Sequence, residues 1–561
     1  MIVALLGIGV GIIGLIIIYR AYCSYRKQRL KEYLRLKWGN SPSMSDDINN
    51  FENIGVYWRL KSKKLIAEGA TNYIDDITWN DLSMDEVFEK INFTESSIGE
   101  SYLYDRLHLL SFDEKELETF EELVQYMDRN EEVRLTIQVA LNKIGKALHN
   151  TMEYYLFDIE KKTSYYRALY NFLGVLPLIS LLVLFTNLKL GIYFLIGTTA
   201  LNAYIHNKYA NNLIYEMTDL KSIYTMLCSA KVISKLEGEG IRTYCNKLNE
   251  ACKKLDYIMK FNVRFLLSTH SDLGILQDYA GIVTLSQIRV HHKLLTLLKE
   301  QTEALRCIYD TLGLLESSIA VASYRSTLDY WVIPIFNLEQ TLEVENIYHP
   351  LLDQPIPNSA RFSHNALITG SNASGKSTFV KALAINGILA QTIHTVLATR
   401  YNAPMSYYMT SMAISDSIDN GESYYIAEIR SLKRILDAIG QYPFCICFVD
   451  EILKGTNTVE RIAASASILK YLSVEKCLCF VASHDIELTR LLKESYKNYH
   501  FCEQIDQSGI SFDYKIYEGP SSTRNAIKLL EVMAYEETIT NEANKLASYF
   551  MEHQAWPEAD R

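Results

Sequence analysis

Residues 366 to 380 read ALITGSNASGKSTFV, a short apolar run followed by Gly370, four residues, and then Gly375, Lys376 and Ser377. Glycines at this spacing let backbone N–H groups turn toward phosphate oxygens, and the start of the next helix adds partial positive charge. Lys376 would reach the outer phosphates of a nucleoside triphosphate, and the Ser377 hydroxyl would bind Mg²⁺. The pattern predicts a P-loop. The alternative is a glycine-rich turn with only a structural role.

Two further apolar runs are followed by polar side chains that could bind a metal ion, activate water or contact phosphate. Residues 444 to 451, FCICFVDE, end in Asp450 and Glu451, and carboxylates are costly at the end of a buried strand unless they have partners. We expect Asp450 to hold Mg²⁺ and Glu451 to act as general base toward the attacking water. The run 477 to 482 is followed two residues later by His484, at the edge where open α/β sheets bind ligands. We expect His484 to sense the γ-phosphate. The alternative is that His484 is an ordinary surface or core histidine with no contact to nucleotide.

Composition limits the classes of protein that this chain can represent. Its 561 residues, 48% of them apolar, indicate several folded domains. A formal charge of −10 argues against a surface that grips nucleic acid throughout, so any DNA contact must be local. The ten cysteines form no CxxC pair, and those at 445, 447, 477 and 479 fall at strand spacing in apolar runs. Such cysteines behave as small hydrophobic residues, which indicates neither a zinc site nor a disulfide framework.

The first residues predict a membrane anchor. Residues 2 to 18 are apolar or glycine and would form roughly 25 Å of helix, close to the hydrocarbon thickness of a bilayer. A cleaved signal peptide is the competing interpretation, but no basic residue precedes the apolar run and no small-residue cleavage site follows it. The basic run from Arg20 to Lys37 instead predicts a cytoplasmic flank that contacts anionic lipid.

A second apolar block, Phe172 to Ile205, is interrupted only at residues 187 to 189 and predicts a helical hairpin. Its arms of about 15 residues are short for a membrane span, so a hairpin buried in protein is the alternative. With the N-terminus outside, three spans would return the chain to the cytoplasm after about residue 206. Helical spacing dominates residues 57 to 145 and 208 to 330, and after Pro334 short strands alternate with helices as in an α/β domain with a largely parallel sheet. Residues 522 to 550 predict two amphipathic helices.

The segments TGSNASGKST, DEILKGTNT and ASHDIEL look like the Walker A, Walker B and switch-histidine segments of the MutS family of DNA mismatch-repair ATPases. DNGESYYIAEI, residues 419 to 429, resembles the family's signature. The resemblance implies ATP and Mg²⁺ as cofactors and a homodimer in which Ser423 faces the γ-phosphate of the opposite subunit. Lys454 stands where an Arg is common in the family, and Asn457 stands where a Ser is common. The residues expected to contact nucleotide are Gly370, Ser371, Asn372, Ala373, Ser374, Gly375, Lys376, Ser377, Thr378 and Ser423.

Residues 91 to 107 and 314 to 352 are similar to the start of the family's helical core and to its lever helix, so the resemblance covers about residues 70 to 550. It implies a fold of long helices followed by a P-loop α/β ATPase domain, to which the apolar runs described above add the predicted transmembrane helices. The expected regions are a span at 1–19, a basic juxtamembrane segment at 20–56, a helical core at 57–170, a membrane hairpin at 171–206, a lever at 207–335, and the ATPase domain with C-terminal dimerisation helices at 336–561.

The expected function is ATP binding and hydrolysis in a dimer that moves the helical arms, with the ATPase domain cytoplasmic and tethered to the membrane. DNA and membrane lipid are the expected partners. No room exists before residue 57 for the family's mismatch-reading domain, so direct mismatch readout is not expected. The alternative is an ATP-driven machine that acts on the bilayer or on a membrane protein and has no DNA role.

Overall fold

The computed structural model describes residues 2–40, 51–146, 152–158, 167–260, 279–371, 374–412, 424–454, 456–506, 509–521, 526–533, 535–553 and 556–557. The chain forms two compact units. Unit 1 comprises residues 1–71, 89–106 and 119–327, and unit 2 comprises residues 72–88, 107–118 and 328–561. Unit 2 therefore takes two short segments from the N-terminal half of the chain in addition to the region expected to be the ATPase domain.

Unit 1 is helical, as the spacing of apolar residues predicts. Its core gathers apolar faces from helices far apart in sequence, including Leu227 and Ile233 of one helix and Leu305, Leu312 and Ile319 of another. The helices wholly or mainly in this unit are α1 (Ile2–Lys37), α2 (Phe51–Ile54), α3 (Val56–Ala67), α6 (Ser97–His108), α7 (Glu114–Arg129), α8 (Glu131–Leu141), α9 (Tyr154–Phe157), α11 (Arg167–Thr186), α12 (Leu188–Ile233), η1 (Glu239–Ile241), α13 (Arg242–Lys254), α14 (Asp256–Lys260), α17 (Ser286–Glu300) and α18 (Thr302–Arg325).

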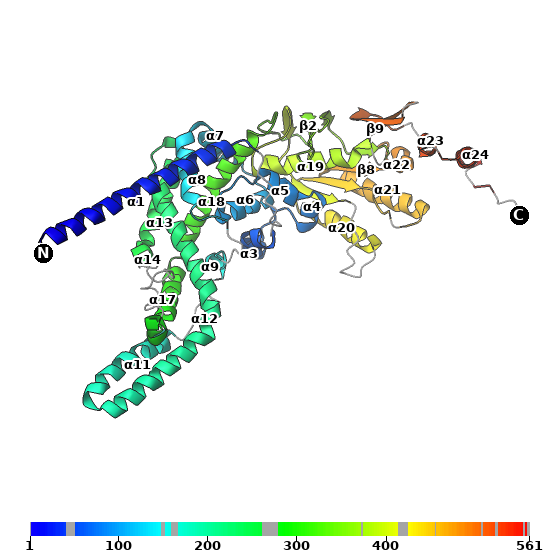
Figure 1. Ribbon diagram of the computed structural model, residues 1–561. Helices are drawn as coiled ribbons and strands as arrows, with labels where there is room; N and C mark the ends of the chain where they lie inside the picture. Colours follow the sequence, from blue (N-terminus) through cyan, green and yellow to red (C-terminus); the bar gives the residue numbers. More distant parts are fainter. Residues whose placement is uncertain are drawn as a thin grey trace. The chain divides into compact units, whose positions relative to one another are not determined.

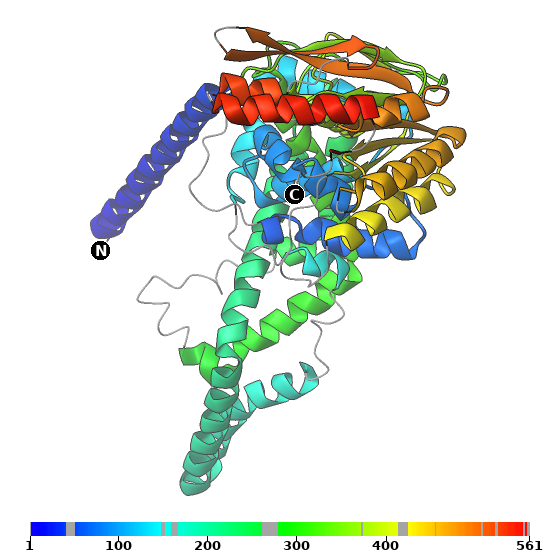
Figure 2. The ribbon, with the colours of Figure 1, turned by 90° about the vertical axis from the view of Figure 1, so that its right-hand side faces the viewer.

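Helices α11 and α12 form the predicted hairpin (Figure 1). Figure 2 shows α12 as one continuous helix that runs from the hairpin turn back into the helical core. Within the described residues, Ala168–Thr186 and Leu188–Tyr209 are long and apolar enough to cross a membrane, and only 28% and 17% of these segments are buried. Exposed apolar side chains lie on opposite sides of α11, as at Phe172 and Leu181, rather than along one stripe. The first predicted span is helical but is not among these candidates.

The base of the hairpin is covered by protein. The Asn202 side-chain amide donates to the carbonyl oxygens of Leu173 and Val283, at 3.0 and 2.7 Å. A Cβ atom at Gly174 would lie 2.3 Å from the Thr284 carbonyl oxygen, so the chain before α17 contacts α11 directly. The uncovered arms are therefore about 175–186 and 188–201, which corresponds to about 20 Å of helix.

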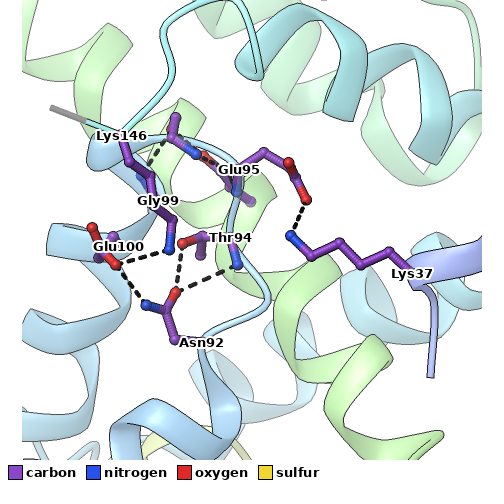
Figure 3. A network of polar contacts seen from close by, with 9 residues as sticks. Lys37, Asn92, Thr94, Glu95, Gly99, Glu100 and Lys146 are labelled. Atoms are coloured by element: carbon purple, nitrogen blue, oxygen red, sulfur yellow. Dashed lines mark hydrogen bonds and ion pairs between the residues drawn. The ribbon is translucent and has the colours of Figure 1, made fainter. Parts of the chain in front are cut away.

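The C-terminal turns of α1 bind to the helical core rather than remaining free. Leu34 is buried against α8, and Arg35 forms ion pairs with acidic residues of the same helix. Lys37 lies 2.7 Å from Glu95 in the loop before α6, and Figure 3 shows this ion pair beside the cluster that joins Glu100 to Lys146. The basic side chains at the end of the run are thus paired with acidic residues of the protein, whereas residues 20 to 29 are exposed.

A buried carboxylate closes the loop that Lys37 contacts. Glu316 of α18 accepts hydrogen bonds from the backbone N–H groups of Glu95 and Ser96, at 2.5 and 2.8 Å, and from the Ser96 hydroxyl. Burial raises the pKa of Glu316 to about 7, against the effect of these donors. The helix α18 and the loop before α6 are therefore held together by polar contacts inside the core.

Unit 2 contains the predicted α/β arrangement. Its six-stranded sheet has the order β10-β9-β4-β8-β7-β6, parallel except for the β9–β10 hairpin, and a second sheet has the order β1-β5-β2-β3. The strands are β1 (Ile335–Phe336), β2 (Leu342–Ile347), β3 (Asn358–Phe362), β4 (Ala366–Thr369), β5 (Arg400–Ala403), β6 (Tyr407–Ser411), β7 (Cys445–Asp450), β8 (Cys477–Ser483), β9 (Lys497–Asp506) and β10 (Gly509–Glu518). The helices are α4 (Asp76–Asp81), α5 (Met84–Ile91), α19 (Lys376–Thr392), α20 (Tyr424–Ile439), α21 (Thr458–Val474), α22 (Ile486–Leu491), α23 (Ala526–Val532) and α24 (Glu537–His553).

Successive side chains of the central strands point to opposite faces of the sheet. Cys445, Cys447, Cys477 and Cys479 pack against α20, α21 and α22, and all four are free and buried, as expected for small hydrophobic residues. α19 lies on strands β6, β7 and β8. The edge strand β6 is covered by α4, where the Asp81 carboxylate accepts hydrogen bonds from the Thr410 hydroxyl and the Met412 N–H.

Candidate nucleotide-binding site

Three strands bring the predicted site residues to one edge of the sheet. In the parallel pairings Thr369 of β4 lies opposite Ser483 of β8, and Asp450 of β7 lies opposite Ala482 of β8. The carboxyl ends of these strands therefore meet, and the residues that follow them share this edge. The sequence placed Glu451 inside the strand, whereas the strand ends at Asp450 and Glu451 begins the turn.

The loop between β4 and α19 has the backbone geometry that glycine permits. Gly370 has φ +145° and Gly375, which precedes α19, has φ +99°. A Cβ atom at Gly370 would lie 2.9 Å from the Phe501 carbonyl oxygen, so the neighbouring strand leaves no space for a side chain. The Ser374 hydroxyl donates to the Ser371 carbonyl oxygen at 2.8 Å and closes the loop on itself.

Lys376 lies at the centre of this loop with its ammonium group directed inward. Its Nζ atom donates to the carbonyl oxygens of Gly370 and Ser371, both at 2.7 Å, and lies 3.5 Å from His484 Nε2. Burial lowers the pKa of Lys376 to about 8, and the negative charge of Asp450 acts in the opposite direction. A lysine held in this way is a buried cation close to neutral pH, suited to an anionic ligand.

Glu451 and His484 form a direct contact. His484 Nε2 lies 2.7 Å from Glu451 Oε1, and Lys454 pairs with the same carboxylate. The Glu451 N–H donates to the Ala482 carbonyl oxygen at 2.9 Å, which ties the turn after β7 to the end of β8. Burial lowers the pKa of His484, and the charges of Lys376 and Lys454 add to the shift.

The donor set fits a hard cation with oxygen ligands. Asp450 Oδ1 is buried and has no hydrogen-bond partner among the described residues, and a buried unpaired carboxylate oxygen is costly. Ser377 is half-buried in the first turn of α19. No group of three or more His, Cys, Asp or Glu side chains in the described part of the chain is placed to hold a metal. These observations fit Mg²⁺ held by one carboxylate and one hydroxyl with phosphate and water as the other ligands, and they do not fit zinc.

A cavity of about 530 Å³ opens beside the loop. Gly375, Ser377 and Thr378 form one wall. The remaining lining residues are Ile347, Tyr348, His349, Leu352, Gln354, Pro355, Ile356, Asn358, Phe379, Ala382 and Tyr514. Its volume is in the usual range for a small-ligand pocket.

Two residues of the cavity wall were not expected from the sequence. Tyr514 has φ +53°, and its ring lies 3.1 Å from the position of a Cβ atom on Gly375. Burial lowers the pKa of His349 to about 4, so this ring is neutral, and its Nδ1 atom accepts from the Leu351 N–H at 3.2 Å. The aromatic and proline residues around position 350 were the available signal, but this region was interpreted as part of residues 314–352, which are similar to the family's lever helix.

Asn372, Ala373 and Ser423 lie outside the described residues, so their predicted nucleotide contacts stay predictions. Of the remaining predicted residues, Ser374 and Lys376 are buried and Thr378 is exposed.

Residues 366–551 match the family model of MutS domain V. Curated relatives include a DNA mismatch repair protein MutS of Thermus thermophilus, 26% identical over 255 residues that make up 45% of this chain and 31% of that protein. MutS protein homolog 4 of Homo sapiens is 28% identical over 274 residues, which make up 45% of this chain and 29% of that protein. The MutS of Persephonella marina is 28% identical over 235 residues, 40% of this chain and 27% of that protein. The C-terminal region is MutS-like.

These matches show that the region from about residue 366 onward is similar to the MutS family. The MutS-like region contains every described residue of the loop, the strand ends and the histidine that form the site. The chain spans less than a third of the length of the relatives that it matches.

Proposed function

We propose that the chain is a membrane-tethered ATPase of the MutS type that binds and hydrolyses ATP in a homodimer and thereby moves its helical arms. Lys376 binds the outer phosphates, and Asp450 with Ser377 holds Mg²⁺. When bound, the metal neutralises charge on the phosphates. Glu451 orients the attacking water as general base, and His484 faces the γ-phosphate.

The convergence of Lys376, Asp450, Glu451 and His484 at one sheet edge, next to the cavity, carries this proposal. The four side chains come from three separate strand ends, and their charges act on one another. A glycine-rich turn with only a structural role would not need a buried lysine between two carbonyl oxygens and an unpaired carboxylate. The arrangement therefore supports phosphoryl transfer to water more strongly than a structural turn.

Two substitutions test the site in the full-length protein reconstituted with lipid. Lys376→Ala should abolish ATP binding, because the buried cation is lost. Glu451→Gln should retain ATP binding while turnover falls by about 100-fold or more, because the general base is lost. Unchanged hydrolysis in either variant would refute the assignment of residues to this site.

The dimer is proposed from the resemblance of residues 419–429 to a signature segment and from the two C-terminal helices. Thr540 is the one described residue of α24 that is buried, so most of this helix has a surface available to a second copy of the chain. Light scattering of the reconstituted protein with ATP and the Glu451→Gln substitution should give the mass of a dimer. A strict monomer under these conditions contradicts a composite site.

Membrane tethering is proposed from the apolar surface of the hairpin together with the apolar N-terminal run. Apolar side chains on all sides of a helix suit lipid, whereas a protein partner needs only one apolar stripe. The uncovered arms of about 20 Å are shorter than the hydrocarbon layer of about 30 Å, but local thinning and an extended Lys189 side chain at the turn can bridge the difference.

Cysteine labelling tests whether the hairpin crosses the bilayer. In a Cys23→Ser background, Asn187→Cys in sealed vesicles should react with an impermeant maleimide from the non-cytoplasmic side. The exposed Ser467→Cys in α21 is the matched control and should react only from the cytoplasmic side. Labelling of both cysteines from the same side contradicts a crossing.

The movement driven by ATP hydrolysis could act on one of two kinds of partner, DNA or the membrane. The resemblance favours DNA contact by the helical arms, whereas the exposed apolar hairpin favours action on the bilayer or on a membrane protein. ATP turnover measured with DNA, with anionic vesicles and with neither chooses between them. DNA stimulation that is lost steeply with salt supports the DNA class, and its absence at low salt removes that class.

A further inference from the structure

Glu428 contacts the turn that carries the proposed general base. It lies on α20, and its carboxylate accepts hydrogen bonds from the backbone N–H groups of Leu453 and Lys454. These residues follow Glu451 within the same turn after β7. Glu428 falls within residues 419–429, but no role was expected for it from the sequence.

The turn needs such support because its backbone is in an unfavourable conformation. Glu451 has φ +55° and Leu453 has φ +58°, in the left-handed region that side chains with a Cβ atom rarely adopt. Residues persist there only when their surroundings hold them in place. The Glu451 N–H is held by Ala482 of β8, which fixes the start of the turn. Glu428 fixes its end.

The placement of Glu428 is costly for a residue with only a packing role. The residue is 6% exposed, and its Oε2 atom has no hydrogen-bond partner among the described residues. Burial raises the pKa of this carboxyl, and the two N–H groups oppose that effect. The two backbone N–H groups that donate to Glu428 therefore explain why a carboxylate is buried at this position.

We propose that Glu428 is a positioning residue, which holds the turn after β7 in the conformation that presents the Glu451 carboxylate to the attacking water. The inference rests on the proposed ATPase function. Glu428 lines neither the phosphate-binding loop nor the cavity, so its loss should act on turnover and not on nucleotide affinity. A displacement of about 1 Å at a catalytic group can lower turnover by about 100-fold.

The test compares Glu428→Ala and Glu428→Gln in the full-length, lipid-reconstituted protein. Glu428→Ala should lower kcat by about 10- to 100-fold with the Kd of ATP within threefold of wild type. Glu428→Gln keeps an oxygen that can accept one N–H group and should retain more turnover than the alanine variant. Asp437→Asn removes the same charge from an exposed position of the same helix and should leave kcat unchanged.

Each outcome decides the proposal. It is overturned if Glu428→Ala keeps kcat within twofold, if the glutamine variant is no more active than the alanine variant, or if both lose ATP affinity together with turnover. If the alanine variant does not fold, the glutamine variant alone must show reduced kcat with unchanged Kd. Failure of the ATPase function itself is distinct, because wild-type protein would then show no hydrolysis that Lys376→Ala removes.

Discussion

His484 Nε2 and Glu451 Oε1 lie 2.7 Å apart, so the proposed phosphate sensor and the proposed general base share a hydrogen bond. An N–H group at this ring nitrogen can donate to the carboxylate. The contact orients the carboxylate, which is also paired with Lys454. The position of one residue therefore depends on the other.

We predict that His484→Ala lowers kcat by about 100-fold while the Kd of ATP changes by less than threefold. The histidine orients Glu451 but is not part of the loop that holds the phosphates. Steady-state hydrolysis and binding of a fluorescent ATP analogue measure the two quantities. Wild-type turnover in His484→Ala would show that the contact has no role in hydrolysis.

ATP binding should weaken above pH 8. In the free protein Lys376 loses its proton near this pH, because burial lowers its pKa to about 8. Affinity should fall by up to about tenfold per pH unit from there. The stability of the folded protein should change in the other direction, and it should not fall over this pH range. Because the pKa of Lys376 is lower in the folded protein than in the unfolded chain, the contribution of this group to stability rises between pH 8 and 10.5. Circular dichroism at each pH should therefore show folded protein, and constant affinity to pH 10 contradicts the prediction.

His349→Ala should weaken ATP binding by about 3- to 10-fold and affect kcat less. The substitution removes part of the cavity wall and the acceptor for the Leu351 N–H, a loss of about 1 kcal/mol. His364 is exposed and absent from the cavity wall, so His364→Ala is the matched control. Equal affinity of the two variants, measured by calorimetry, would show that the cavity wall at His349 does not contribute to ATP binding.

The sequence predicted the strands that carry the site because each is a short apolar run followed at once by a polar residue. The runs before Gly370 and His484 and the run ending in Asp450 are the strands β4, β8 and β7. Parallel strands end at one edge, so their order along the chain was enough to bring these residues together.

Contacts between distant residues could not be predicted in this way. The position of Tyr514 over Gly375 depends on the irregular pairing of β9 with β10, which no local pattern reveals. Lys37 was interpreted as part of a lipid-facing basic run, but its partner, Glu95, lies 58 residues away. Asp81 lies shortly before α5 in the sequence, but its carboxylate accepts hydrogen bonds from the edge strand β6 and the residue after it, which are donors that only the fold brings close.

Gly99→Ala should destabilise unit 1 by about 1–3 kcal/mol. A Cβ atom there would lie 2.3 Å from the Glu316 carboxyl group, which cannot move away because backbone N–H groups and a hydroxyl hold it. Gly281→Ala is the control, since its Cβ atom would meet nothing closer than 3.6 Å. Chemical unfolding followed by circular dichroism compares the two variants. A Gly99→Ala protein as stable as the control would show that α6 can shift away from α18.

A double-mutant cycle on Glu121 and Arg325 should separate the pairing of these charges from their burial. Two hydrogen bonds of 2.9 and 2.6 Å join the carboxylate and the guanidinium, and both side chains are almost fully buried. Removal of one partner leaves an uncompensated charge in the core, so Glu121→Leu or Arg325→Met should each lower the free energy of unfolding by about 3–5 kcal/mol. The double variant should recover most of this loss, because no charge is left unpaired.

The exposed pair Lys433 and Asp437 provides the control for the cycle, and Asp437→Asn should change stability by less than about 0.5 kcal/mol. Urea unfolding of the four proteins of the cycle gives the coupling energy directly. The recovery is the decisive quantity. If the double variant were as unstable as the sum of the single variants, the two residues would contribute to stability independently, and the ion pair itself would contribute nothing.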